Sequence, residues 1–192
     1  MTFKILTDST TDLSEKWALE HDVAIVGLTI QLDGVTYETV GENKLTSKVL
    51  LDKMNTGSQP TTSQINVGQF EDVFKKYAKA GEPLLYIAFA SSLSGTYQSA
   101  VMAKDMVLEE YPEAVIEIFD SRAASMGEGL LVMEAVKARA EGKSLTETVD
   151  LLLNLRLLKA LKEYFDFVLN NPLHIIVNIW RVFKLNKLSF LG

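Results

Sequence analysis

An apolar run that leads through a hydroxyl-rich loop into a long helical segment constrains the fold of this chain most. Residues 83–89 (PLLYIAF) have the length and composition of a buried strand. They lead into residues 90–96 (ASSLSGT), and residues 97–111 follow with a helical pattern. Such a unit places backbone N–H groups at a helix N-terminus, where an anion is favoured. The loop therefore predicts a helix cap or, because it holds more hydroxyls than a cap needs, a site for a carboxylate or phosphate.

Strands and helices alternate along the rest of the chain. The two classes are assigned from apolar runs and from apolar residues at three- and four-residue spacing. Strands are expected at 3–7, 23–26 and 115–119, and helices at 13–20, 67–80, 126–141 and from 145. Asp33-Gly34 between two short strands is a hairpin signal. The pattern predicts an α/β fold: a mainly parallel sheet with helices on both faces, one small antiparallel hairpin and a helical C-terminal tail.

Helix starts can be assigned from capping residues. For the helix at 13–20, Asp12 or Thr11 is the expected N-cap, with Glu15 completing a capping box. Ser125 is the expected cap of the helix at 126–141. Gly127 and Gly129 in its first turn cost up to ~1 kcal/mol each relative to alanine. They therefore predict a close approach of the backbone to a ligand or to a neighbouring strand.

Polar clusters follow three of the predicted strands directly. They are Asp8-Ser9, residues 91–94 and Asp120-Ser121. In a parallel sheet the carboxyl ends of the strands share one edge, where ligands bind. We therefore expect the three clusters to converge, and residues 61–63, which precede a helix, to join the same rim. This convergence predicts a site.

The residue types limit the chemistry of that site. The chain has no cysteine and only two histidines, His21 and His174, far apart in sequence. A serine nucleophile at Ser91 or Ser94 would lack a neighbouring base, and no nucleotide-binding glycine motif is present. Binding is therefore favoured over catalysis. The alternative is a metal-dependent hydrolase of a small phosphate or carboxylate ester, in which Asp8 and Asp120 hold Mg²⁺.

Charge and hydropathy bound the partners. Residues 1–156 carry 14 basic and 23 acidic side chains, whereas residues 157–192 carry five basic and two acidic ones. An acidic main body argues against a nucleic-acid partner. The N-terminal residues lack the apolar stretch of a signal peptide, and no apolar run reaches the length of a membrane span, so we expect a cytoplasmic protein.

The motifs, taken together, resemble those of the bacterial DegV family. The matching segments are 5–13 (ILTDSTTDL), 62–64 (TSQ), 90–100 (ASSLSGTYQSA) and 120–127 (DSRAASMG). Each is weak alone, but their order and spacing are specific. The resemblance covers residues 1–156, which it identifies as a lipid-binding N-terminal α/β domain.

The resemblance implies a fatty-acid-binding protein that holds a long-chain fatty acid and presents it to a separate kinase for acyl-phosphate formation. It implies a carrier without catalytic residues, cofactor or metal. The ligands of the fatty acid carboxylate would be Thr62 and Ser91, with Ser94 and the amide of Gly95 as secondary contacts. The residues expected to brace them are Asp8, Ser9, Ser63 and Asp120.

Residues 157–192 do not resemble the second domain of that family. We expect a divergent apolar and basic tail, from a truncation or from a frameshift near Leu157, which sequencing of the locus would test. The alternative is a genuine short form whose tail packs on a partner protein or contacts a membrane surface peripherally. A fatty acid bound by the first domain alone would expose much of its chain. Losing five buried methylenes costs about 4 kcal/mol, so weak or absent lipid binding is expected.

Overall fold

The chain divides into two compact units, Met1–Leu152 and Leu153–Gly192. A computed structural model describes residues 2–42 and 44–170. The last helix, α6 (Leu145–Asn170), therefore contains the start of the predicted tail, whose remainder, with His174, lies outside the described residues. The assignment of residues 157–192 as a separate tail stays a prediction. Within the described range, no helix is both long and apolar enough to cross a bilayer.

A four-stranded parallel sheet forms the centre of the first unit. Its strand order is β2-β1-β6-β7, and each neighbouring pair is parallel. The strands are β1 (Lys4–Asp8), β2 (Val23–Val26), β6 (Leu84–Ala88) and β7 (Ile116–Asp120). Every residue of β6 is buried, as expected for an inner strand covered on both faces. The predicted α/β class is confirmed.

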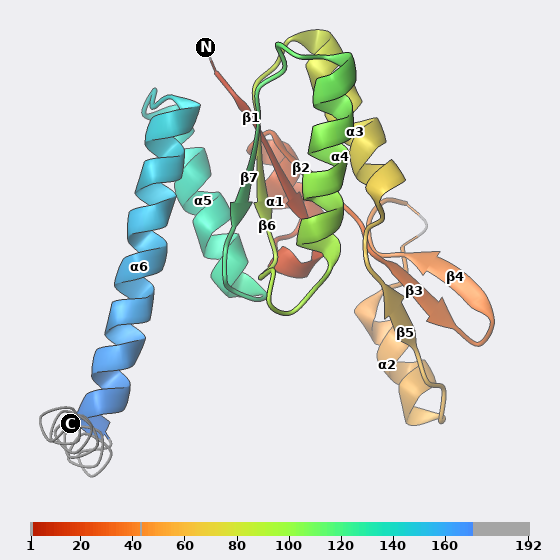
Figure 1. The fold of residues 1–192 in the computed structure, drawn as a ribbon. Coiled ribbons are helices and arrows are strands. Elements are labelled where there is room, and N and C mark those ends of the chain that lie inside the picture. Colours follow the sequence, from red (N-terminus) through yellow and green to blue (C-terminus); the bar gives the residue numbers. More distant parts are fainter. Residues whose placement is uncertain (1, 43, 171–192) are drawn as a thin grey trace, which may run out of the picture. The chain divides into compact units, whose positions relative to one another are not determined.

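Helices cover both faces of this sheet (Figure 1). On one face α3 (Val67–Ala80) and α4 (Thr96–Glu110) pack together, and on the other lies α5 (Met126–Ala140). Phe70 and Phe74, one turn apart on α3, meet Tyr86 of β6, with ring centroids of Phe70 and Tyr86 5.0 Å apart. A short helix, α1 (Glu15–Glu20), packs beside β2. The apolar spacing of the sequence thus predicted the core face of α3 correctly.

The predicted hairpin belongs to a second sheet. Strands β3 (Thr29–Leu32) and β4 (Val35–Glu38) pair across Asp33 and Gly34, whose φ angles of 52° and 80° suit the tight turn. Strand β5 (Thr61–Ser63) adds antiparallel to β3 and completes the order β4-β3-β5. Helix α2 (Ser47–Asn55) lies between β4 and β5 in the chain. Residues 61–63 are therefore a strand, which their hydroxyl-rich composition did not predict.

The predicted capping box at the first helix is wrong. The chain first makes a 3-10 turn, η1 (Ser9–Thr11), which the Asp8 side chain caps and which ends at Asp12 in the left-handed conformation. Helix α1 starts afterwards, and its N-cap is Ser14, whose hydroxyl accepts a hydrogen bond from the Trp17 amide at 3.1 Å. Because Asp12 terminates η1, it is not available to start α1.

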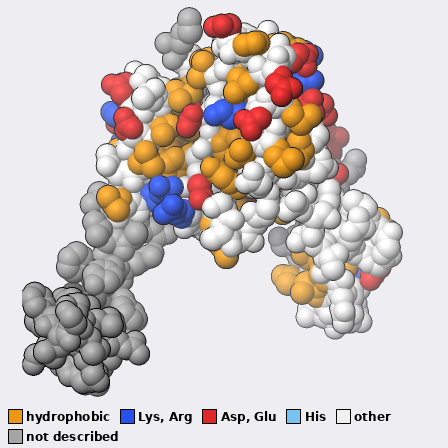
Figure 2. Space-filling view, viewed as in Figure 1, with side chains coloured by type: hydrophobic (Ala, Val, Ile, Leu, Met, Phe, Trp, Pro, Cys, Tyr) orange, Lys and Arg blue, Asp and Glu red, His pale blue; other side chains and the backbone are white. Residues whose placement is uncertain are grey.

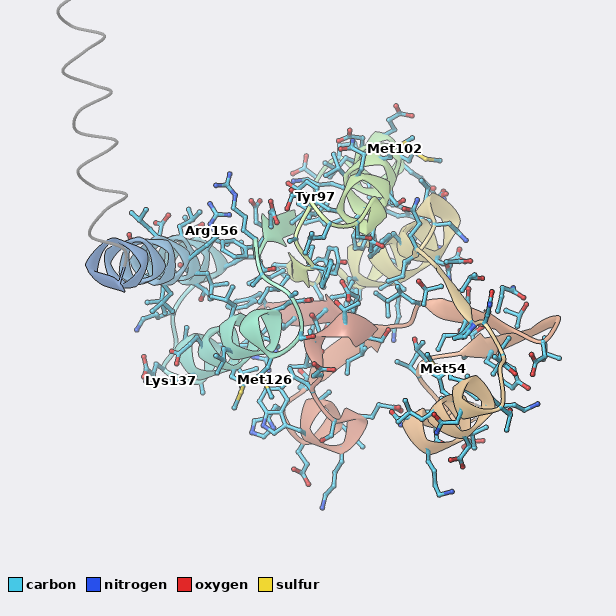
Figure 3. All side chains as sticks on the ribbon, turned by 90° about the horizontal axis from the view of Figure 1, so that it is seen from below. Met54, Tyr97, Met102, Met126, Lys137 and Arg156 are labelled. Carbon is cyan, nitrogen blue, oxygen red and sulfur yellow. The ribbon has the colours of Figure 1, made fainter. Side chains whose placement is uncertain are left out.

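Apolar side chains reach the surface of the first unit in several places. Figure 2 shows hydrophobic side chains interspersed with acidic and basic ones on the face that carries α4. Met102, labelled in Figure 3, projects from α4 and is half exposed. Met126, also labelled there, opens α5 and is similarly exposed.

Candidate functional site

The three predicted polar clusters meet at the carboxyl edge of the parallel sheet. Asp8 is the last residue of β1 and Asp120 the last of β7, and the strand between them, β6, continues into residues 89–95. The register pairs Thr7 with Ile87 and Ala88 with Asp120, so all three ends lie level. The expected convergence is present because the strands are parallel. Each connecting helix returns the chain to the other edge of the sheet, so every strand ends at the same edge.

Asp8 ties the end of β1 to the loop after β6. One carboxylate oxygen accepts hydrogen bonds from the amide and hydroxyl of Thr10, at 2.9 and 2.5 Å. The other accepts from the Tyr86 hydroxyl at 2.9 Å and from the Phe89 amide at 3.3 Å. Asp8 is fully buried. The burial of Tyr86 itself, together with the negative charge of Asp8, raises the pKa of Tyr86 well above its usual value. Asp8 thus braces the loop that holds Ser91.

Ser91 is bound to Asp120 through both of its donors. The Ser91 amide donates to one carboxylate oxygen at 3.1 Å and the Ser91 hydroxyl to the other at 2.7 Å. The amide of Arg122 also donates to Asp120, at 3.0 Å. Burial raises the pKa of Asp120, but the hydrogen bonds from the Ser91 hydroxyl and from the two amides outweigh it, so the pKa lies below its usual value. Asp120 is therefore an anion that fixes Ser91.

Ser94 and Gly95 form the N-terminus of α4. The Ser94 hydroxyl accepts from the Thr96 amide at 3.2 Å and donates to the Thr96 hydroxyl at 3.0 Å, so this serine closes a local turn just before the helix. Gly95 occupies the N-cap position. In the part of the chain that the structure describes, its N–H group finds no acceptor. This amide lies at a helix N-terminus, where an anion is favoured.

Thr62 and Ser63 lie on β5, opposite Ile30 and Thr29 of β3. Both are exposed, and the Thr62 hydroxyl makes no side-chain hydrogen bond to a described residue. Two residues further on, the Gln64 side chain lies directly against the α-carbon of Gly95. This contact brings the segment after β5 to the loop after β6.

Ser9 was expected to brace the residues that bind the carboxylate, but its hydrogen bonds lead to the second sheet. Its hydroxyl forms a hydrogen bond with the Thr39 hydroxyl at 2.8 Å and accepts from the Leu28 amide at 3.2 Å. These partners flank the hairpin of the second sheet. Ser9 therefore connects the end of β1 to that sheet.

A buried carboxyl group that sequence reasoning missed, Glu128 of α5, lies beneath the site. It is fully buried and contacts the hydroxyls of Thr7 at 3.0 Å and Thr10 at 2.9 Å. Thr7 also donates to the carbonyl of Ile87 at 3.0 Å. Because a hydroxyl has a single proton, Thr7 cannot donate to this carbonyl and to Glu128 at the same time. Burial, followed by the nearby charge of Asp8, raises the pKa of Glu128 to about 9. The signal in the sequence was an acid between two glycines of an otherwise apolar helix start.

The start of α5 departs from its expected cap. Ser125 is at the N-cap position, but its side chain caps nothing, and its backbone has φ 51° and ψ −132°. The prediction of a Ser125 cap is wrong because this conformation directs the side chain away from the first turn. A close approach does occur at Gly129, where an added Cβ would lie 2.6 Å from the backbone oxygen of Thr11, but its partner is the 3-10 turn η1 and not the predicted ligand or strand.

The described residues do not fit a Mg²⁺ site between Asp8 and Asp120. Both oxygens of Asp8 already accept hydrogen bonds, and across residues 2–42 and 44–170 no three acidic or histidine side chains are grouped to hold a metal ion. His21 is the C-cap residue of α1, where its ring stacks on Trp17 at 4.3 Å. The hydrolase alternative therefore has no support in this geometry.

A parallel α/β sheet with hydroxyls and a helix N-terminus at its carboxyl edge places this chain among the α/β proteins in which that edge is the usual place for a ligand. The chain belongs to the DegV family, because the family model described as "Uncharacterised protein, DegV family" matches residues 2–160. A DegV domain-containing protein of Streptococcus pyogenes serotype M1 is 58% identical over 152 residues, which are 79% of this chain and 53% of the relative.

The fold is shared with solved structures, among them these two. A stearic acid-binding protein from Eubacterium ventriosum has a TM-score of 0.72 and 32% identity, with 78% of this chain and 52% of that chain covered. A DegV family protein from Thermus thermophilus, described by its fatty acid binding, has a TM-score of 0.71 and 31% identity, with 81% and 54% covered. The chain therefore spans about half the length of the relatives that it matches.

Proposed function

We propose that this chain binds the carboxylate of a long-chain fatty acid at the edge formed by β1, β6 and β7. The proposed ligands are the Thr62 and Ser91 hydroxyls, with Ser94 and the Gly95 amide as further contacts. The observation that carries the proposal is the Gly95 N–H, which has no acceptor among the described residues and lies in the same loop as Ser91 and Ser94. The fatty acids bound by the solved relatives support a carboxylate as the anion.

The proposed activity is binding without catalysis. The Ser91 hydroxyl has a carboxylate, Asp120, as its partner, and a carboxylate with a lowered pKa is a poor base for generating a nucleophile. The bound acid would then be passed, in the cytoplasm, to a separate kinase that forms the acyl phosphate. This step is part of the proposal and rests on the family relationship alone.

The proposed affinity of the 192-residue chain is low. The head-group ligands come from β5 and from the loop after β6, whereas the relatives that bind fatty acids are about twice as long as the matched region. Each methylene left in water forfeits about 0.8 kcal/mol. We therefore expect a dissociation constant for palmitate or oleate weaker than about micromolar.

Displacement of a fluorescent fatty acid from the purified chain tests this function. Oleate should compete, whereas methyl oleate, which lacks the negative charge, should compete about tenfold less well. Thr62→Val and Ser91→Ala should each weaken oleate binding, and Thr146→Val, at an exposed position of α6, should not. Equal competition by the acid and the ester would contradict carboxylate recognition. Submicromolar binding of oleate would contradict the proposed low affinity.

A further inference from the structure

The geometry around Ser91 points to a role for Asp120 beyond bracing. The two oxygens of Asp120 face the two donors of a single residue, the amide and the hydroxyl of Ser91, at 3.1 and 2.7 Å. This is the two-point arrangement by which a serine of a loop binds a carboxylate ligand. Asp120 therefore occupies, with its own carboxylate, the Ser91 hydroxyl that the proposed function assigns to the head group.

A serine hydroxyl has one proton and cannot donate it to two carboxylates at once. While that proton is directed at Asp120, the Ser91 oxygen presents only lone pairs to a ligand. A ligand carboxylate also presents only lone pairs, so it gains nothing from Ser91 in this orientation. It must take the proton away from Asp120, which then loses a charge-assisted hydrogen bond.

Asp120 cannot easily move aside to make this exchange less costly. It ends β7, where its pairing with Ala88 and the adjacent hydrogen bond from the Ser121 amide to the Ala88 carbonyl fix the backbone. The Arg122 amide holds one of its oxygens at 3.0 Å, and the Arg122 guanidinium lies 3.9 Å from the other. The side chain is 15% exposed, so water reaches its oxygens only in part.

We infer that Asp120 is an internal competitor for the carboxylate head group: it holds the Ser91 hydroxyl proton and so lowers the affinity of the loop for an ionised acid. This inference rests on the proposed function and adds a regulatory element to the same site. A neutral hydroxyl head group is not subject to this competition, because it can donate its own proton to the Ser91 oxygen. Asp120 thereby sets the preference between a carboxylate and an alcohol.

Asp120→Asn tests the inference directly, because the two side chains have the same shape. The asparagine oxygen can still accept from the Ser91 and Arg122 amides, while its NH₂ group donates to the Ser91 oxygen. The Ser91 proton is then free to reach a ligand. Binding is measured from the amide chemical shifts of the ¹⁵N-labelled 192-residue chain, titrated separately with octanoate and with 1-octanol.

We expect Asp120→Asn to tighten octanoate binding by about tenfold and to leave 1-octanol binding unchanged. Asp105→Asn is the matched control, since it removes the same charge from an exposed position of α4 and should change neither affinity. In the Ser91→Ala background the gain from Asp120→Asn should disappear. If the asparagine variant does not fold, Asp120→Ser takes its place as the test. It also removes the competing carboxylate and should act in the same direction.

Three results would overturn the inference: octanoate binding that is unchanged or weaker in Asp120→Asn, an equal gain for 1-octanol, or a gain that persists without the Ser91 hydroxyl. Failure of the proposed function looks different. In that case octanoate shifts no amide of residues 90–95 in the unmodified chain or in any variant.

Discussion

The Gln64 side chain lies directly over the α-carbon of Gly95 and leaves no room for a side chain there. Gln64 follows β5, which contains Thr62, and Gly95 opens α4. The contact therefore joins the two segments that are proposed to bind one carboxylate. Only glycine permits this approach at position 95, although its own backbone conformation is an ordinary one, with φ −71°.

Gly95→Ala should separate these segments at little cost in stability. The added methyl group meets the end of a flexible side chain, which can turn away, so we expect the free energy of unfolding to fall by less than about 1 kcal/mol. Binding of octanoate should nevertheless weaken, because the β5 segment loses its contact with the loop. In the double variant Gln64→Ala/Gly95→Ala the clash is absent, so alanine at position 95 should cost less there. A large loss of stability in the single variant would contradict this account.

Gly129→Ala should be far more costly. Here the new methyl group meets the backbone oxygen of Thr11 at 2.6 Å, and α5 and η1 must move apart. Overpacking of this kind costs about 1–3 kcal/mol, measurable by urea unfolding. Gly68→Ala in α3 is the control, because its Cβ would have an ordinary contact and alanine is the better helix former, so that variant should be slightly more stable. Equal effects at the two positions would argue against the close packing of α5 on η1.

Glu128 should make stability fall as pH rises. Its pKa is about 9 in the folded chain and near the ordinary glutamate value of 4.5 when the chain is unfolded, so between these values the folded state retains a proton that the unfolded state has lost. Linkage then predicts that Glu128 lowers the free energy of unfolding by about 1.4 kcal/mol per pH unit in this window, and by nothing further above it. Below pH 4.5 both states are protonated and the effect is absent.

Glu128→Gln provides the comparison for this prediction. Glutamine is neutral at every pH and can still bond to the hydroxyls of Thr7 and Thr10, which glutamate contacts at 3.0 and 2.9 Å. Urea unfolding at pH 5.5, 7.0 and 8.5 should show the variant gaining on the parent chain as the pH rises. Parallel pH profiles for the two proteins would show that Glu128 is ionised in the fold.

Ser125→Gly should stabilise the chain. Serine has φ 51° and ψ −132° at this position, a conformation that a Cβ disfavours, and its side chain caps no helix. Relief of this strain is expected to contribute about 1 kcal/mol, which thermal unfolding can detect. Ser14→Gly should have the opposite sign, since it removes a hydroxyl that caps α1. Destabilisation by Ser125→Gly would mean that the serine makes a contact of its own.

The sequence was informative where one local rule decided the structure. Apolar periodicity placed Phe70 and Phe74 in the core, and the Asp33-Gly34 turn identified the hairpin, because both signals lie within a few residues. It failed where distant segments compete for the same residue. Strand β5 exists because β3 offers a free edge, and Asp12 does not cap α1 because it already ends η1.

For the site, the sequence predicted which strand ends converge but not the partners of individual side chains. Parallel pairing alone places Asp8, Ser91 and Asp120 at one edge. Ser91 donates to Asp120, and Glu128 lies under Asp8 and Thr10. These contacts depend on strand register and on the packing of α5, which no local pattern encodes. The ligand roles of Thr62, Ser91, Ser94 and Gly95 remain predictions.

Amide chemical shifts of the ¹⁵N-labelled 192-residue chain during titration with octanoate test the central claim most directly. The account predicts that the largest shifts occur at Thr62, Ser91, Ser94 and Gly95, that they saturate together, and that they vanish in the Thr62→Val/Ser91→Ala variant. Two results would contradict a carboxylate site at the edge of the sheet. Octanoate could shift instead the amides around the surface hollow lined by Leu19, Ile25 and Val40, or it could shift no amide at all.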